Sequence, residues 1–246
     1  MKLITLNTWG ARIKEPFTEF IKKHQDIDIF CFQEVYDKSK EILGEEYPDS
    51  NHDLFNELST LLPNHNGFFR PVLQGVYGIA MFINKNYSVL EEGEILIHGR
   101  NQEGTINAGH HDRNMQWLKF EHEGRALTVL NVHGLWNGKG KADVPEKIAQ
   151  SRIIKDFMNK LEGPKILCGD FNLNPDTKSI KMLEEKMRNL IKEYSVPSTR
   201  NSIYFSKPGK TENFADYIFV SPDIIVKNFQ VLPEEVSDHA ALLLET

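Results

Sequence analysis

Two polar residues follow a short apolar run in the second half of the chain. After the run 166–168 comes a glycine, and Asp170 and Asn172 then stand one residue apart. This pattern indicates a buried strand that delivers an acid and an amide to the loop at its C-terminal end. Ligands bind at such strand ends in α/β sheets, so both side chains are candidates to face a metal-bound phosphate. Glycine, aspartate and asparagine are also the commonest turn residues, and an ordinary turn is the alternative.

Three more polar residues stand at the ends of predicted strands. Asn7 ends the N-terminal strand, Glu34 follows the strand 27–32, and His133 follows the strand 126–132. A carboxylate in such a place suits a hard cation. Taken singly, Glu34 also fits a surface glutamate and Asn7 a turn amide.

Acidic and imidazole groups recur near the C-terminus. Asp216 stands near the start of the apolar strand 214–220, and Asp238 and His239 head the predicted terminal strand 236–244. A charged pair at the start of an apolar strand must be either solvated or engaged by other groups. These three residues therefore join the candidates.

The elements that carry these residues repeat one order twice. Strand, helix and strand follow one another over 2–9, 16–24 and 27–32, and again over 126–132, 141–161 and 166–168. Such units normally make parallel strand pairs with a right-handed crossover. The repetition predicts a two-halved α/β fold whose strand ends converge on one cleft.

The middle of the chain has a different texture. Strands and turns between residues 67 and 99 predict an antiparallel meander. The polar segment 100–113 predicts a mobile loop at the rim of the site. Its adjacent histidines, His110 and His111, fit solvated side chains better than metal ligands. Arg113 offers a planar fork that can clamp a phosphate oxygen.

The remaining segments complete an alternating α/β pattern. Helical spacing predicts helices over 54–62 and 179–190, and a further strand is predicted over 224–232. The polar loop 199–213 is the most basic segment near the candidate site, and it carries Arg200.

Length and composition limit the class of protein. The chain of 246 residues is 40% hydrophobic and predicts one domain over 1–246. A net charge of −6 argues against a broad basic surface for nucleic acid but allows a small phosphate site. Cys31 and Cys168 lie in apolar runs and are expected to be buried thiols. Without a signal peptide or a membrane-length apolar stretch, we expect a cytoplasmic protein with no membrane span.

Six short motifs share their order and spacing with a known superfamily. They are Leu6-Asn7-Thr8-Trp9, Gln33-Glu34-Val35, Asn131-Val132-His133-Gly134-Leu135, Gly169-Asp170-Phe171-Asn172, Ala215-Asp216-Tyr217-Ile218 and Ser237-Asp238-His239. In these motifs the chain resembles the endonuclease/exonuclease/phosphatase superfamily. The resemblance implies a four-layer α/β/β/α sandwich of two mixed β-sheets, with the site at one end of the sheets. It also implies magnesium-dependent cleavage of a phosphoester.

The resemblance and the chemistry of the side chains together suggest a metal site. Glu34 is the first-choice Mg²⁺ ligand, aided by Asn7 and, through water, by Asp238. Mg²⁺ keeps much of its hydration and takes few protein oxygens, which fits a set of this size. Mn²⁺ is the alternative ion.

The resemblance also implies catalytic roles. Asp170 would act as general base or orient the attacking water, and Asn172 would fix that water or the phosphate. His239 would donate to a phosphoryl oxygen, and His133 would stabilise transition-state charge or protonate the leaving oxygen. Asp216 would hold one histidine in its tautomer.

The motifs narrow the substrate only partly. His133 matches the branch that includes pancreatic-type deoxyribonucleases and sphingomyelinases. Trp136 fits either a base-stacking ring or a core aromatic, whereas Trp9 fits the core better. Arg113 and Arg200 are the expected substrate-binding cations. The favoured function is a nuclease acting on DNA or RNA. The alternatives are a hydrolase of a lipid headgroup or small phosphoester, and a non-catalytic phosphate-binding protein; no protein partner is predicted.

Overall fold

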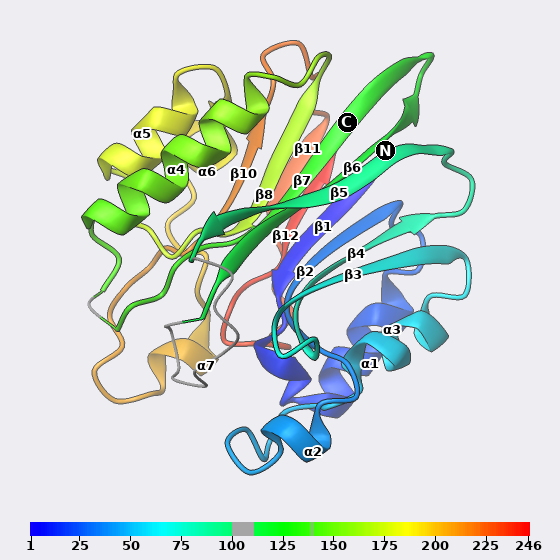
Figure 1. Ribbon diagram of the computed structural model, residues 1–246, viewed down its shortest axis with the longest axis vertical. Helices are drawn as coiled ribbons and strands as arrows, with labels where there is room; N and C mark the ends of the chain where they lie inside the picture. The colour runs from blue at the N-terminus through cyan, green and yellow to red at the C-terminus, as the bar shows by residue number, and fades with distance from the viewer. Residues whose placement is uncertain (100–110, 139) are drawn as a thin grey trace.

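Two β-sheets pack face to face and helices cover their outer faces (Figure 1). The structure is a computed structural model and describes residues 1–99, 111–138 and 140–246. The arrangement is a four-layer α/β/β/α sandwich of two mixed sheets, which confirms the predicted fold. Among the described residues, no helix is long and apolar enough to cross a membrane.

The first sheet has six strands in the order β11-β12-β1-β2-β4-β3. Their bounds are β1 (Lys2–Asn7), β2 (Ile29–Tyr36), β3 (His65–Leu73), β4 (Tyr77–Asn84), β11 (Asn228–Val231) and β12 (Leu242–Glu245). β1 and β2 are parallel, as the strand–helix–strand reading predicted, and the other pairs are antiparallel. Helices α1 (Lys14–Lys23) and α3 (Leu54–Leu61) cover the outer face of this sheet (Figure 1).

The second sheet also has six strands, in the order β5-β6-β7-β8-β10-β9. Their bounds are β5 (Val89–His98), β6 (Arg113–His122), β7 (Arg125–His133), β8 (Lys165–Asp170), β9 (Arg188–Asn189) and β10 (Asp216–Val220). The parallel pair β7 and β8 confirms the second predicted strand–helix–strand unit. Its helix α4 (Pro145–Met158) lies with α5 (Lys178–Glu184) and α6 (Leu190–Glu193) on the outer side of this sheet.

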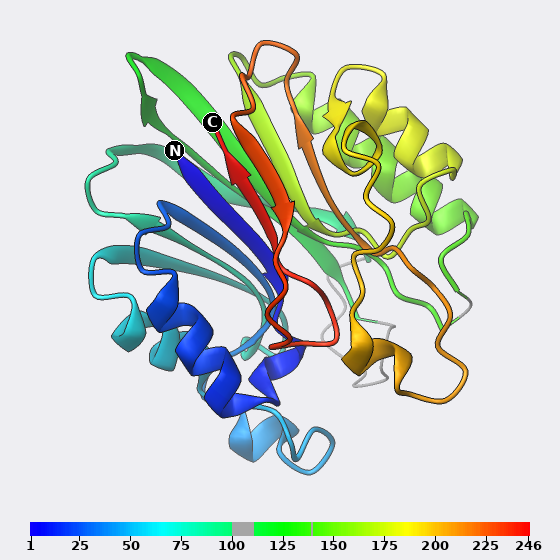
Figure 2. The same cartoon turned by 180° about the vertical axis from the view of Figure 1, so that it is seen from behind.

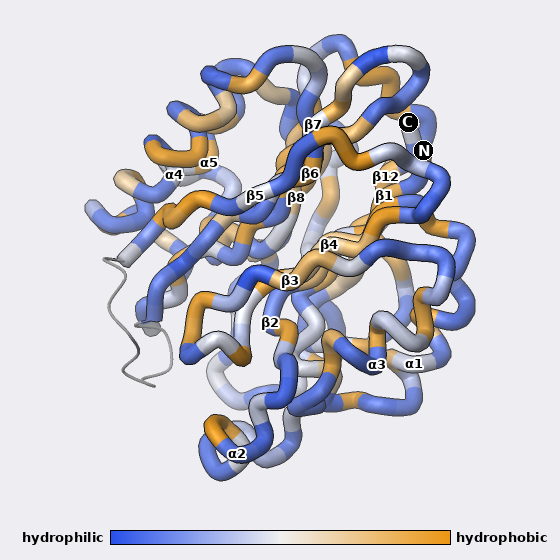
Figure 3. Tube along the Cα trace, turned by 45° about the vertical axis from the view of Figure 1, so that its right-hand side comes forward, coloured by the Kyte–Doolittle hydropathy of each residue, from blue (hydrophilic) through white to orange (hydrophobic). Residues whose placement is uncertain are grey.

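The main core lies between the sheets. The hydrophobic segments in Figure 3 concentrate in the strands, and the loops that connect them are mostly hydrophilic. Inner strands such as β2 and β8 are buried on both faces and mostly apolar, because a sheet covered on both sides has no solvated face. Cys31 and Cys168 are buried and free within this core, which confirms the prediction for both thiols.

The two ends of the chain lie side by side (Figure 2). β12 pairs antiparallel with β1 so that Glu245 faces Lys2, and the Met1 amino group donates to the Thr246 carbonyl at 2.8 Å. This pairing brings the segment before β12 against the end of β1. There the Ser237 hydroxyl donates to the Asn7 carbonyl at 2.7 Å. A C-terminal motif is thereby fixed next to an N-terminal one.

The middle of the chain departs from the predicted meander. β3 and β4 form a hairpin in the first sheet, whereas β5 crosses to the second sheet and pairs with β6. β4 is almost wholly buried, because β2 and β3 pair with its two edges and leave none for β5. β5 is instead a half-exposed edge strand of the second sheet. Most of the predicted rim loop 100–113, including His110, lies outside the described residues, and Arg113 begins β6.

Several element ends also differ from the predictions. β2 continues past Glu34 to Tyr36, and the helix predicted from residue 141 begins at Pro145 because proline favours the first helical position. Asp238 and His239 precede β12 and do not head it. Between predicted elements lie the short helices α2 (Lys40–Leu43) and α7 (Ser202–Phe205) and the 3₁₀ turn η1 (Trp9–Ala11). α2 and α7 lie at the same end of the molecule in Figure 1.

Candidate active site

Three adjacent strands of the second sheet present three candidate residues in one row. In the β7–β8 register His133 pairs with Asp170, and in the β8–β10 register Asp170 pairs with Asp216. The Gly134 amide donates to the Asp170 carbonyl at 2.6 Å and closes the end of the sheet. Asp170 therefore lies at the centre of the row, with one candidate on each side.

The Gly-Asp-Phe-Asn turn is built around Asp170. Its Oδ1 accepts from the Asn172 amide at 2.8 Å, and Asn172 takes a left-handed φ of 52°. Gly169 is required before it: its φ is 129°, and a Cβ there would lie 2.1 Å from the Val132 carbonyl oxygen. The sequence is thus both a turn and a site, because the turn fixes the Asp170 carboxylate.

The first sheet contributes Asn7 and Glu34 from neighbouring strands. Glu34 sits at a β-bulge of β2 with a φ of 58°, and the Thr8 hydroxyl donates to its carbonyl at 2.9 Å. Such bulges redirect a side chain out of the pleat. The Asn7 Nδ2 donates to Glu34 Oε1 at 3.1 Å and to Asp170 Oδ2 at 3.0 Å. This one amide joins the two sheets at the site.

Glu34 has the environment of a metal ligand. Burial raises its pKa, the bond from Asn7 opposes that rise, and the carboxylates of Asp238 and Asp170 add to it. The Nε2 of His133 lies 3.9 Å from Glu34 Oε1. A cluster of carboxylate and amide oxygens fits a hard divalent cation.

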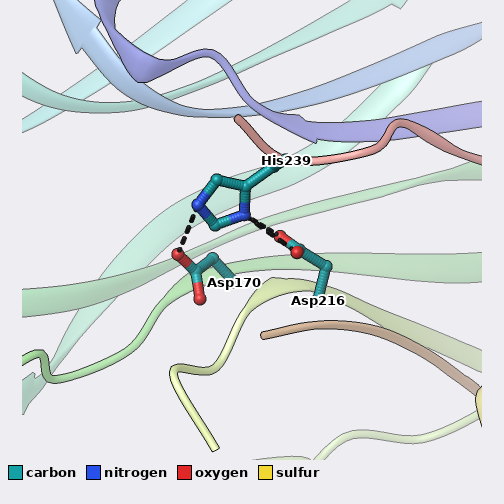
Figure 4. A group of neighbouring side chains, drawn as sticks. All are labelled: Asp170, Asp216 and His239. Atoms are coloured by element: carbon teal, nitrogen blue, oxygen red, sulfur yellow. Dashed lines mark hydrogen bonds and ion pairs between the residues drawn. The ribbon is translucent and has the colours of Figure 1, made fainter. Parts of the chain in front are cut away.

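His239 forms a second unit with two aspartates (Figure 4). Its Nδ1 donates to Asp216 at 2.8 Å, and its Nε2 lies 3.7 Å from Asp170 Oδ2. Ligand atoms of the three residues lie within 4.8 Å of one another, so they too are able to hold a metal. Because Asp216 already binds Nδ1, the simpler interpretation is an oriented imidazole whose Nε2 faces the site.

His133 is held against Arg113. Nη1 of Arg113 lies 3.2 Å from Nδ1 of His133, while Nε2 of His133 lies 3.9 Å from Asp170 Oδ2. Burial lowers the pKa of His133 well below 6.5, and the neighbouring guanidinium lowers it further. His133 is therefore a neutral imidazole. It can donate a hydrogen bond but holds no spare proton.

Asp238 is placed in the cavity but is engaged by cations. Its Oδ2 accepts from Lys207 Nζ at 2.7 Å, and its Oδ1 lies 3.8 Å from Arg200. Burial opposes ionisation, but His239, Arg200 and Lys207 together hold its pKa below the usual value. Because cations already neutralise its charge, the water-mediated role predicted from the sequence stays a prediction.

The predicted substrate-binding residues surround the same cavity. Arg113, Trp136 and Arg200 all line it, together with Glu34, Asp170 and His239. The cavity has a volume of about 230 Å³. Asn7 and Asp216 do not line it and act on residues that do. Trp9, expected in the core, also lines the cavity.

Lys141 is a cation in the cavity that was not predicted. Lys141 is almost wholly buried, and its Nζ donates to Asn172 Oδ1 at 3.1 Å. Burial lowers its pKa to about 8, although the nearby Asp170 carboxylate favours the charged form. The helical spacing over 141–161 predicts a helix that begins at Lys141. The usable signal is Pro145, which favours the first helical position and so places Lys141 before the helix.

Carboxylates, imidazoles and cations gather at one end of a four-layer α/β/β/α sandwich, which is an arrangement suited to phosphoester chemistry. The sequence agrees with the geometry. The chain belongs to the Endonuclease/Exonuclease/phosphatase family, whose model matches residues 4–239. Members of this family hydrolyse phosphoesters with the help of a divalent metal.

Solved structures of distant relatives share the fold over their whole length. An endonuclease/exonuclease/phosphatase protein from Bacteroides vulgatus is 21% identical with a TM-score of 0.72, covering 99% of this chain and 97% of that one. A mannosyl-6-phosphatase from Bacteroides thetaiotaomicron is 19% identical (TM-score 0.74; 100% and 98% covered). The human Nocturnin catalytic domain is 19% identical (TM-score 0.67; 99% and 92%). No curated protein sequence matches the chain.

Proposed function

We propose that the protein is a Mg²⁺-dependent phosphodiesterase, with nucleic acid as the favoured substrate. The observation that carries the proposal is the Asn7 amide, which ties Glu34 of the first sheet to Asp170 of the second. Around this link the fold assembles a metal-ligand set, an oriented imidazole in His239 and several cations. A non-catalytic phosphate-binding protein would need the cations but not the carboxylate pair.

Glu34, Asn7 and Asp170 are the residues that would hold the ion, with Asp238 acting through water. When bound, Mg²⁺ would neutralise the charge that develops on the phosphoryl oxygens. In the structure Asn7 offers its NH₂ to both carboxylates, and its Oδ1 accepts from the Trp9 amide at 3.0 Å. As a ligand, Asn7 would turn its amide so that the oxygen faces the cation.

Asp170 and the two histidines would position the attacking water and stabilise the charge that develops on the phosphoryl group. Asp170 is ionised, because His239 and Lys141 outweigh the effect of burial and hold its pKa below the usual value, and it can therefore orient a water for attack. His239 would donate to a phosphoryl oxygen through Nε2, with Asp216 holding its ring. The neutral state of His133 favours charge stabilisation over protonation of the leaving oxygen.

A second candidate function has a specific observation in its favour. The cavity is small and partly lined by apolar side chains, and the chain is acidic overall. These features suit a small phosphoester as well as the end of a nucleic acid strand. One solved structure with the same fold is a mannosyl-6-phosphatase. A small-molecule phosphoester hydrolase is therefore the alternative to a nuclease.

A substrate panel separates these functions. Single-stranded DNA, duplex DNA, RNA, sphingomyelin, inositol phosphates and sugar phosphates would each be assayed with Mg²⁺, Mn²⁺ or EDTA. We expect Mg²⁺-dependent cleavage of a nucleic acid phosphodiester that EDTA abolishes. Hydrolysis of a lipid or a sugar phosphate alone would overturn the nuclease assignment. If no substrate is turned over with any divalent ion, the assignment as an enzyme is wrong.

Glu34→Gln tests the metal site. The amide keeps an acceptor for Asn7 but removes the negative charge, so the Mg²⁺ concentration for half-maximal activity is expected to rise by about tenfold or more. Mg²⁺ should also raise the unfolding temperature of the wild type more than that of the variant. Glu212→Gln removes a carboxylate from another part of the cavity and is the matched control. An unchanged Mg²⁺ dependence of Glu34→Gln would contradict its role as a ligand.

Lys141→Met tests the unpredicted cation. Removing a donor that faces the developing charge should lower kcat roughly a hundredfold. The unfolding temperature should change little, because the loss of one hydrogen bond to the Asn172 side chain is offset by the relief of burying an ammonium, whereas Lys147 holds two backbone carbonyls. Lys147 is the control: it is equally buried, but its Nζ donates to the Gly140 and Asn172 carbonyls, and it does not line the cavity. Lys147→Met should lower the unfolding temperature and leave kcat within a few fold of the wild type. If Lys141→Met also lowers the unfolding temperature and leaves kcat within a few fold, Lys141 has only a structural role.

A further inference from the structure

One end of the cavity has a lining that the phosphate chemistry does not use. Five residues form it, and we name them the tyrosine arm: Tyr36, Leu43, Tyr47, Leu73 and Tyr77. The ring centroids of Tyr36 and Tyr77 lie 4.9 Å apart, and those of Tyr36 and Tyr47 lie 6.2 Å apart. The arm is built by the end of β2, the end of β3, the start of β4, the short helix α2 and the turn after it, with Glu34 two residues before Tyr36.

A polar ring extends the tyrosine arm. His111 lines the cavity, and its ring packs edge-on against Tyr77 with centroids 5.3 Å apart. Its Nε2 is buried and makes no hydrogen bond to any of the residues that the structure describes. Burial lowers the pKa of His111 to about 2, and Arg113 lowers it further, so the ring is neutral. A buried nitrogen without a partner among the described residues, on a neutral ring that lines a cavity, is a candidate to hydrogen-bond a ligand.

The opposite part of the cavity has a contrasting lining. Lys141, Arg200 and Lys210 line it together with Trp136 and Tyr204. The Arg200 guanidinium lies 4.3 Å from the Tyr204 ring centroid, and Lys210 Nζ lies 5.9 Å from that of Trp136. Three cations are concentrated there, whereas the tyrosine arm consists of rings and leucines with Arg12 nearby, whose charge acts on Tyr36 and Tyr47. One part of the cavity is therefore lined mainly by cations and the other mainly by tyrosine rings. Glu34, Asp170 and His239 line the same cavity.

From this arrangement we propose that the tyrosine arm binds an unpaired nucleobase of the substrate, which is attached through its sugar to the phosphate at the catalytic residues. Aromatic rings are good partners for the flat face of a base, whatever its identity. The unpaired nitrogen of His111 supplies a hydrogen bond that an alkyl chain would leave unmade. An aromatic arm with a polar end thus suits a heteroaromatic group better than a lipid tail.

The proposal rests on the proposed function and narrows its substrate. In a duplex each base is stacked and paired, so its face and edge are not free to enter an enclosed arm unless the base is first taken out of the stack. The substrate class is therefore a single-stranded nucleic acid or a free nucleotide ester. An acidic chain without a broad basic surface fits this class better than it fits a duplex.

The test compares ligands that differ only in the base. Adenosine monophosphate, as its 5′ and 3′ isomers, and ribose 5-phosphate would be titrated into the full chain with Mg²⁺ by calorimetry. We expect at least one nucleotide isomer to bind roughly tenfold or more tightly than ribose 5-phosphate. Octyl phosphate should bind no more tightly than ribose 5-phosphate. Equal binding of nucleotide and sugar phosphate, or tightest binding of octyl phosphate, would overturn the proposal.

Tyr47→Ala assigns the effect to the arm. Tyr47 is partly exposed, so its truncation spares the folded core. We expect the variant to lose most of the nucleotide preference while ribose 5-phosphate binds as before. Tyr194→Ala is the matched control, because Tyr194 is exposed, packs on Phe229 and does not line the cavity. A Tyr47→Ala variant that weakens both ligands equally would exclude a base site. Binding needs no turnover, so the test stands apart from the substrate panel, which alone decides whether the enzyme assignment fails.

Discussion

Asp170→Asn is expected to lower kcat about a thousandfold while the protein stays folded, because the variant loses the carboxylate that orients the attacking water. The carboxylate is ionised in the structure, since His239 and Lys141 outweigh burial and lower its pKa. The amide is almost the same size but can neither accept the proton of a water nor contribute negative charge to the metal set. Steady-state kinetics on the best substrate of the panel, with the unfolding temperature of each variant, measure the effect.

The amide also breaks the pattern of hydrogen bonds at this position. One oxygen of Asp170 accepts from the Asn172 amide, and the other accepts from Asn7 Nδ2. Whichever way the new amide turns, its NH₂ meets a donor, at a cost of roughly 1–3 kcal/mol in stability. Asp176→Asn, an exposed position on the same loop, should change neither activity nor stability. Retention of a tenth or more of the wild-type kcat in Asp170→Asn would remove it from the chemistry.

The centre of the site could be predicted because its residues mark the ends of apolar strands. Asn7, His133 and Asp170 each follow a run that a buried strand explains, and parallel pairing places such ends together. The sequence did not reveal the link across the sandwich, since nothing local shows that the Asn7 amide reaches Asp170 at 3.0 Å. That contact depends on how the two sheets stack, which only the packed core decides.

The site residues that were not predicted have sequence patterns that are typical of ordinary strands and helices. Tyr36 and Tyr77 stand in apolar strands and have the pattern of core residues, which they partly are at 3% and 7% exposure. Lys141 precedes the helix α4, and the helical spacing of the residues after it predicts that the helix includes it. Glu34 was expected just beyond a strand, but β2 continues through it, and the bulge that turns its side chain toward the site is a backbone feature.

His239→Ala is expected to lower kcat by a factor of about 100 to 1,000, because the ring is the oriented donor that faces Asp170. His239 is 4% exposed, so the truncation also leaves a small cavity, and His239→Gln, which keeps more of the volume, serves as a second variant. His122→Ala, at the far end of β6, is the control. A kcat within threefold of the wild type in both His239 variants would exclude it from the mechanism.

Asp216 should act only through His239, and a double-mutant cycle can show this. Its oxygens lie 2.8 and 2.9 Å from Nδ1, and it does not line the cavity. Asp216→Asn alone should lower kcat by roughly 10- to 100-fold, since the ring loses its fixed tautomer and orientation. Added to His239→Ala, the same change should cost almost nothing more, because residues that act as a unit are not additive. Losses that multiply in the double variant would instead give Asp216 a separate role, such as the metal ligand that its cluster with Asp170 allows.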